Sequence, residues 1–148
     1  PDYSSAASDV YKRQSFGFPA STRARSQPTI AMGAVFVGSQ DGTVYAFDLE
    51  TGCVRWTYAA RAEVRTGITL GKRGPDGAAT AYFGDIIANL YAVDATTGEL
   101  VWQTSPDEHH SATLTGTPAY AGVPVRVALW CSSGLVCHTS SPVVASTA

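Results

Sequence analysis

The sequence predicts an all-β protein built from four-stranded antiparallel sheets that repeat along the chain. A 24-residue segment starting at residue 35 aligns without gaps with one starting at residue 81, hence 46 residues later. Within each copy, short runs of β-branched and aromatic residues alternate with Asp, Thr and Gly, which favour strands and tight turns over helices. A repeat of this length made of four short strands is typical of a β-propeller blade.

The first copy contains the strand and turn signals in order. The segment VFVGS at 35–39 predicts a strand, and Asp41-Gly42 supplies the hairpin turn that follows it. The alternating run TVYAFD at 43–48 predicts the next strand, the segment 49–52 the next turn, and CVRWTY at 53–58 the last strand. Upstream, QPTIAMG at 27–33 adds the fourth strand. In the second copy, Asp85 replaces Ser39 at the hairpin and is interpreted as a turn residue.

Both copies share the pattern Ala-x-Asp-x-x-Thr-Gly-x-x-x-Trp. The Asp and Thr side chains are expected to accept hydrogen bonds from backbone N–H groups in the turn, and Gly suits a left-handed backbone position. The tryptophan is expected to pack between adjacent blades, with its indole N–H reaching a neighbouring carbonyl. The structural motif residues are Ala46, Asp48, Thr51, Gly52, Trp56, Ala92, Asp94, Thr97, Gly98 and Trp102.

Inner strands predicted at 27–33, 63–71 and 112–122 divide the chain into units. Residues 27–60 and 61–104 form two complete blades, and residues 105–122 begin a third. Residues 1–25 are interpreted as a non-native or disordered leader, so that propeller repeats occupy 26–122. Residues 123–148 contain neither Asp, Glu nor a Thr-Gly pair. They are therefore interpreted as a divergent or out-of-frame tail.

Composition excludes several classes of function. With 15% charged residues and a formal net charge of −2, the chain offers no electrostatic case for nucleic-acid binding. The chain contains no apolar run of about 18 residues, so no membrane span is predicted. The three cysteines have no recognised metal-binding spacing. GLVCH, at 134–138, lacks the first cysteine of a haem-attachment motif, so no haem is predicted.

At the repeated motif the sequence resembles the tryptophan-docking motif of quinoprotein-type propellers, whose catalytic members use pyrroloquinoline quinone (PQQ). Non-catalytic members carry the same motif. The segments SQPTIAMG, EVRTGI and EHHSATLTGTPAY are similar to the amino-terminal blades of polyvinyl-alcohol-dehydrogenase-type quinoproteins. The resemblance covers residues 26–120 and implies an eight-bladed propeller, of which this chain would be a fragment. It also implies that the remaining blades of an intact chain are partners of this one.

The same resemblance implies a chemistry for the full-length protein. PQQ and Ca²⁺ would be the cofactors, alcohols the substrates and a cytochrome c the electron acceptor, in the periplasm or outside the cell. A fragment of this size is expected to be inactive, because it holds too few blades to enclose the cofactor. Such a cofactor needs cationic and amide groups around its carboxylates, oxygen ligands for Ca²⁺ and a carboxylate base.

Few residues of the chain suit these roles. Arg65, at the start of a predicted inner strand, suits a cofactor carboxylate, and Thr66 could add a hydroxyl donor. The alternative for Arg65 is a solvated arginine or a salt bridge with Glu63. His110 is the third cofactor-binding candidate, with solvated loop histidine as its alternative. His109 is a weaker candidate with the same alternative. Asp107 and Glu108 could be an ion ligand or a base, with a charged turn as their alternative, and no catalytic residue or metal ligand is assigned.

Two functions therefore remain open from the sequence. One is a fragment of a PQQ-dependent alcohol dehydrogenase. The other is a non-catalytic propeller that presents a protein-binding surface, similar to the outer-membrane assembly lipoprotein with the same repeat. A scaffold needs no basic or carboxylate groups on its axis, so EVRTGI and EHHSATLTGTP favour the enzyme.

Overall fold

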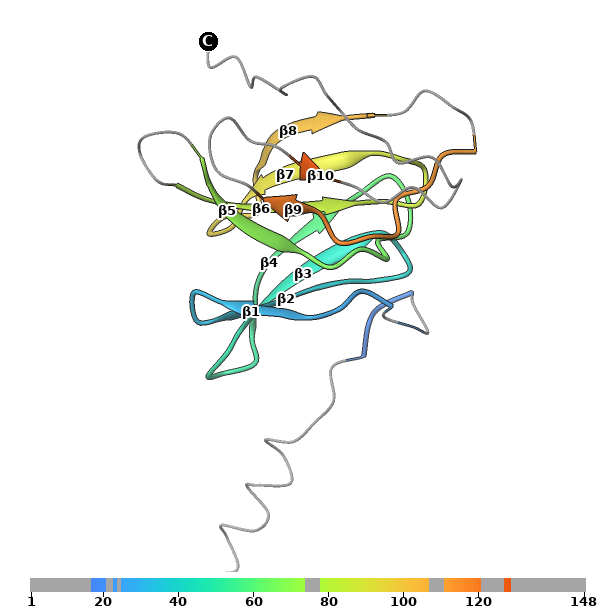
Figure 1. Ribbon diagram of the computed structural model, residues 1–148. Coiled ribbons are helices and arrows are strands. Elements are labelled where there is room, and N and C mark those ends of the chain that lie inside the picture. The colour runs from blue at the N-terminus through green and yellow to red at the C-terminus, as the bar shows by residue number, and fades with distance from the viewer. Residues whose placement is uncertain are drawn as a thin grey trace, which may run out of the picture.

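The computed structural model describes residues 17–20, 23, 25–73, 78–106, 111–120 and 127–128, which contain only β-strands as regular structure. Two sheets have four antiparallel strands each, in chain order. The first contains β1 (Thr29–Ala31), β2 (Ala34–Gly38), β3 (Thr43–Asp48) and β4 (Val54–Ala59). The second contains β5 (Thr69–Arg73), β6 (Ala78–Gly84), β7 (Leu90–Asp94) and β8 (Leu100–Thr104). The two sheets lie one on the other (Figure 1), which confirms the predicted all-β blades.

A third, two-stranded sheet follows the second. It pairs β9 (Ala119–Tyr120) with β10 (Val127–Ala128) in antiparallel register. The Tyr120 ring covers Gly71 of β5 so closely that a Cβ on this glycine would lie 2.5 Å from the ring. Tyr120 also stacks on Tyr82, with ring centroids 5.8 Å apart. The third sheet therefore packs on β5 and β6 of the second.

The inner strands are shorter than the sequence predicts. Residues 63–68 form a connector rather than the first half of β5, because their backbone groups bond to both neighbouring sheets. The Val64 N–H donates to Ser39 O at 3.2 Å, whereas Glu63 O accepts from Ile86 N at 3.0 Å. The buried side chains of Val64 and Ile68 hold this connector in the core.

The core lies between the two four-stranded sheets and follows the period-two pattern of strands. Residues at alternating positions of the first sheet face residues at alternating positions of the second, and nearly all of them are fully buried. This cluster comprises Ala34, Phe36, Val44, Ala46, Trp56, Val64, Ile68, Ala81, Phe83, Tyr91, Val93 and Ala95. Both sheets also shift register at the same place, at Ala46/Phe47 and Ala92/Val93. The two copies therefore share their backbone irregularity as well as their sequence.

Trp56 joins the two sheets. It is 8% exposed, and its Nε1–H donates to Ala95 O at 3.0 Å. Its ring covers Gly98, where an added Cβ would lie 2.7 Å from ring atoms. The indole of the first sheet thus lies on the Thr-Gly turn of the second. Trp102, at the same position of the second sheet, is half-buried and packs near Tyr82 at 6.0 Å.

The Asp-Thr-Gly turns have the predicted hydrogen bonds. Asp48 Oδ1 accepts from the N–H groups of Glu50 and Thr51, at 3.1 and 2.9 Å. Asp94 Oδ1 accepts in the same way from Thr96 and Thr97. The second residue of each Thr-Gly pair has positive φ, 71° at Gly52 and 77° at Gly98.

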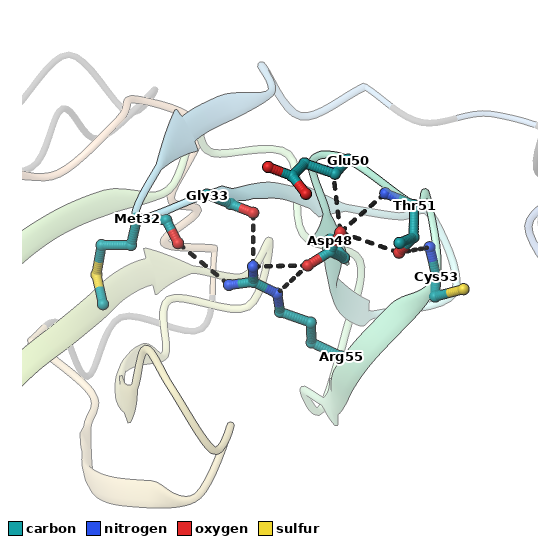
Figure 2. Close-up of polar contacts among 7 residues, drawn as sticks. All are labelled: Met32, Gly33, Asp48, Glu50, Thr51, Cys53 and Arg55. Atoms are coloured by element: carbon teal, nitrogen blue, oxygen red, sulfur yellow. Dashed lines mark hydrogen bonds and ion pairs between the residues drawn. The ribbon is translucent and has the colours of Figure 1, made fainter.

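Arg55 adds a feature that only the first sheet has (Figure 2). Its guanidinium pairs with Asp48 Oδ2, with Nη2 at 2.7 Å and Nε at 3.1 Å. It also donates to the carbonyls of Met32 and Gly33 at 3.1 and 2.7 Å. Arg55 therefore ties the β1–β2 turn to the β3–β4 turn. The equivalent residue of the second sheet is Val101, which cannot form these bonds.

The turn at Asp48 is expected to make the stability of the chain sensitive to acid. The N–H of Thr51, followed by the Arg55 guanidinium, holds the pKa of Asp48 well below its ordinary value. A carboxyl whose pKa is depressed by folding contributes stability above its unfolded pKa, and this contribution is lost as the pH falls through the folded pKa. The loss should therefore begin near pH 4 and continue downward.

Asp48→Asn is expected to flatten the pH dependence of urea unfolding below about pH 4. Arg55→Gln should flatten it partly, because the bonds from the turn N–H groups remain. Glu63, whose pKa is also lowered, supplies a residual slope in both variants. An acid slope in Asp48→Asn equal to that of the original chain would contradict this prediction.

Candidate functional site

The candidate site lies at the opposite end of the sheets from the Asp-Thr-Gly turns. Antiparallel strands alternate in direction, so the β2–β3 turn and the β4–β5 connector share one end, and the β3–β4 turn lies at the other. The backbone links this end together, since Ala60 N donates to Gly42 O at 2.9 Å. Arg65 and Thr66 both lie on the connector. The repeated motif is therefore remote from the residues predicted to bind a cofactor.

Arg65 pairs with Glu63, as the alternative interpretation of the sequence proposed. Arg65 Nη2 lies 2.8 Å from Glu63 Oε2. The side chain of Glu63 is 8% exposed and that of Arg65 is 37% exposed, so the guanidinium lies between the carboxylate and the surface. The position differs from the prediction in one respect, because Arg65 precedes β5 by several residues instead of starting it.

The pair leaves two polar atoms without partners in the described structure. Glu63 Oε1 and Arg65 Nε are buried and form no hydrogen bond with described residues. Buried polar atoms are normally satisfied, and such exceptions call for an explanation such as a bound group. The hydrogen bond from Arg65 lowers the pKa of Glu63 despite burial, and that same bond raises the pKa of Arg65. At neutral pH the site thus holds a carboxylate and a guanidinium with unused capacity on each.

Thr66, predicted as a hydroxyl donor to a cofactor, has its side chain directed at β6. It is fully buried, and its hydroxyl donates to Gly84 O at 3.1 Å and accepts from Gly84 N at 2.9 Å. Its carbonyl accepts from the Ser26 hydroxyl at 2.7 Å. Thr66 therefore anchors the connector to β6 and fixes the backbone next to Arg65.

The remaining candidates lie outside the described residues. His110, His109, Asp107 and Glu108 all fall in the undescribed segment before Ser111. Within the described ranges, no group of three or more His, Cys, Asp or Glu side chains is arranged to hold a metal ion. The same ranges include no helix with the length and hydropathy to cross a membrane.

A buried carboxylate network adjoins the connector. Asp85 is fully buried, and its Oδ1 accepts from the N–H groups of Ile87 and Asn89 at 3.1 and 2.9 Å. These bonds form the β6–β7 turn although the second copy lacks Asp-Gly, which confirms Asp85 as a turn residue. Its Oδ2 accepts from Asn89 Nδ2 and from the Tyr91 hydroxyl, at 2.9 and 2.8 Å.

The Tyr91 hydroxyl links the network to the β4–β5 connector, because it also accepts from Arg61 N at 3.0 Å. Burial, with the Asp85 carboxylate as a further cause, raises the pKa of Tyr91 to about 12. Tyr91→Phe is expected to lower the free energy of unfolding by roughly 1–3 kcal/mol, because Arg61 N and Asp85 Oδ2 each lose a partner. Urea unfolding measures this effect. A Tyr91→Phe variant with the same free energy of unfolding as the original chain would contradict the role of the network.

Comparisons with known proteins agree with the geometry. The PQQ-repeat family described as outer membrane protein assembly factor BamB matches residues 9–145. A polyvinylalcohol dehydrogenase from Pseudomonas sp is 33% identical in an alignment of 126 residues that covers 81% of this chain and 19% of that protein. BamB from Burkholderia pseudomallei is 34% identical in an alignment of 109 residues that covers 66% of this chain and 27% of that protein.

Structural comparison gives the same fold. The crystal structure of BamB from Moraxella catarrhalis superposes with a TM-score of 0.60 at 23% identity, covering 78% of this chain and 32% of that one. This chain thus spans about a fifth to a third of the proteins it matches. Its sheets correspond to part of a propeller, and the chain belongs to the PQQ-repeat β-propeller family.

Proposed function

We propose that this chain contributes blades to a PQQ-dependent alcohol dehydrogenase of the polyvinyl alcohol type. The observation that carries the proposal is Arg65, a half-exposed guanidinium with its Nε unused, held by a buried carboxylate at the entry to an inner strand. A guanidinium in this state suits a cofactor carboxylate, which it can bind through two parallel hydrogen bonds. A purely scaffolding propeller has no need of such a pair.

The described residues fit part of the cofactor. Arg65 would hold a carboxylate of PQQ, and Glu63 would orient Arg65 and offer Oε1 to a donor. When bound, the quinone would accept the electrons from an alcohol, and a cytochrome c would take them onward. Calcium ligands would come from other parts of the propeller, since the described residues hold no cluster for a metal ion. Such a protein would work in the periplasm or outside the cell.

A second candidate is a protein-binding scaffold. The family match and the 34% identity to BamB from Burkholderia pseudomallei favour it. On this alternative, Arg65 and Glu63 would be an ion pair that only holds the connector. Both functions would use the same blades. The residues at the end of the sheets that carries Arg65 and Glu63 therefore distinguish them.

The test uses the full-length protein that contains these blades, with PQQ and Ca²⁺ added. Binding is followed by the absorbance of PQQ, and activity by dye reduction with secondary alcohols. Arg65→Gln is expected to weaken PQQ binding by at least tenfold, because a charge-assisted hydrogen bond is lost. Arg55→Gln, at the opposite end of the sheet, should leave binding unchanged. A full-length protein that neither binds PQQ nor oxidises alcohols would favour the scaffold. The present chain alone should show no dye reduction under either function.

A further inference from the structure

Of residues 18–29, those that the structure describes lie against the first sheet as residues 58–69 lie against the second. The Gln40 N–H donates to Arg23 O at 3.3 Å, and the Ile86 N–H donates to Glu63 O at 3.0 Å. The donors are 46 residues apart, as in the repeat, and the acceptors are 40 residues apart. The segment before β1 is thus a connector of the same kind as the one before β5.

Aromatic contacts support this equivalence independently. Phe18 packs edge-on against Tyr45 of the first sheet, at 5.3 Å and 73° between ring planes. Tyr58 packs edge-on against Tyr91 of the second sheet, at 5.7 Å and 62°. Phe18 and Tyr58 are again 40 residues apart. Phe18 therefore packs on the first sheet as Tyr58 packs on the second.

The inner strands begin in the same way in successive sheets. The hydroxyl of Thr29, the first residue of β1, donates to Ile68 O at 2.7 Å, and that of Thr69, the first residue of β5, donates to Pro118 O. The same offset of 40 residues that relates Thr29 to Thr69 relates Arg25 to Arg65. Each arginine precedes an inner strand by four residues, at the same end of adjacent sheets.

Arg25 acts on the same carboxylate as Arg65. Its charge is among the causes that lower the pKa of Glu63, after the hydrogen bond from Arg65. Arg25 is exposed, and no described residue forms an ion pair with it. The segments that carry the two arginines are in contact, because the Ser26 hydroxyl donates to Thr66 O at 2.7 Å. The two guanidinium groups and the Glu63 carboxylate together carry an excess of one positive charge. Glu63 does not pair with every donor of these arginines, since Arg65 Nε has no partner among the described residues.

We propose that Arg25 and Arg65 together form a binding site for a ligand with two or more carboxylates, with Glu63 as the residue that positions Arg65. Each guanidinium would bind one carboxylate through paired hydrogen bonds. The inference rests on the proposed function only where the ligand is PQQ itself. It assigns a ligand-binding role to a segment that the sequence alone indicates to be a leader.

The test compares three variants of the present chain: Arg25→Gln, Arg65→Gln and the control Arg61→Gln. Arg61 lies on the β4–β5 connector, but its charge acts on Tyr58 rather than on Glu63. Two probes are titrated at millimolar concentrations, tricarballylate as a plain tricarboxylate and PQQ. Binding is measured by the NMR signals of the arginine Nε–H groups, and circular dichroism checks that each variant keeps its sheets.

Arg25→Gln and Arg65→Gln are each expected to weaken the binding of both probes by about tenfold or more, and Arg61→Gln by less than about twofold. Arg25→Lys should recover part of the affinity, because the charge returns without the planar fork. Binding that requires Arg65 but is as strong in Arg25→Gln as in Arg61→Gln would overturn this inference and leave the proposed function standing. Tricarballylate binding through both arginines without PQQ binding would support the site and count against PQQ. No binding of either probe would overturn the site.

Discussion

Replacing Trp56 with alanine is expected to lower the free energy of unfolding by about 3–5 kcal/mol, the usual cost of removing a large buried aromatic side chain. The indole is 8% exposed and lies between the sheets, so its removal leaves a cavity there. It also removes the donor to Ala95 O, which then lies in the core without its partner. Urea unfolding followed by circular dichroism, together with hydrogen exchange of the β7 amides, measures the effect.

Two further variants identify the source of the loss. Trp56→Phe keeps an aromatic ring but no N–H donor, so its cost should be smaller and should report the hydrogen bond to Ala95 O. Trp102→Ala makes the same change at a half-buried position of the second sheet and should cost clearly less. Equal losses in Trp56→Ala and Trp102→Ala would show that the position of the Trp56 indole between the sheets adds nothing to its contribution.

The sequence predicts most of the fold because the fold depends on a repeated local chemistry. Asp48 and Asp94 bond to the N–H groups that follow them, and Gly52 and Gly98 adopt positive φ. These interactions form within a few residues, so their sequence signals are short. Trp56 is informative for a related reason, since an indole is too large to be buried within one thin sheet.

The inner strands could not be predicted to the same accuracy. The segment EVRTGI has the β-branched residues of a strand, yet Val64 N and Glu63 O bond to different sheets. Such a bridging connector depends on how two sheets pack, which a local pattern does not record. The same packing determines the role of Thr66, whose hydroxyl contacts Gly84 in β6. Arg65, in contrast, could be identified as a candidate because exposed charge at a strand entry is a local feature.

The sequence alone could not indicate Arg25 as a ligand-binding residue, because the segment around it lacks the features by which the repeat is detected. Phe18 contacts Tyr45 as Tyr58 contacts Tyr91, but the residues around it share little identity with the second connector. The offset is also 40 residues instead of 46, so a search at the period of the motif misses it. A comparison of RARSQPTI with EVRTGITL at this second offset aligns Arg25 with Arg65 and Thr29 with Thr69.

The second large effect is expected at Gly98, with Gly52 as its matched control. Both glycines follow Thr in the same turn and both have positive φ, so alanine should cost each of them about 1–2 kcal/mol in backbone strain. Their surroundings differ. A Cβ on Gly98 would lie 2.7 Å from ring atoms of Trp56, whereas no heavy atom of the described residues lies within 4 Å of a Cβ on Gly52. Gly98→Ala should therefore cost about 1–3 kcal/mol more than Gly52→Ala, the usual penalty for overpacking.

A double-mutant cycle separates this contact from the strain of the turn. If the excess cost arises from the indole on Gly98, it should disappear when Gly98→Ala is made in a chain that already carries Trp56→Ala. Gly52→Ala should cost the same in all backgrounds, because no described side chain lies over it. An excess at Gly98 that persists without the indole would place the penalty in the turn itself. In that case Trp56 and the Thr-Gly turn of the next sheet would stabilise the fold independently, and the repeated motif would shape each blade without joining it to its neighbour.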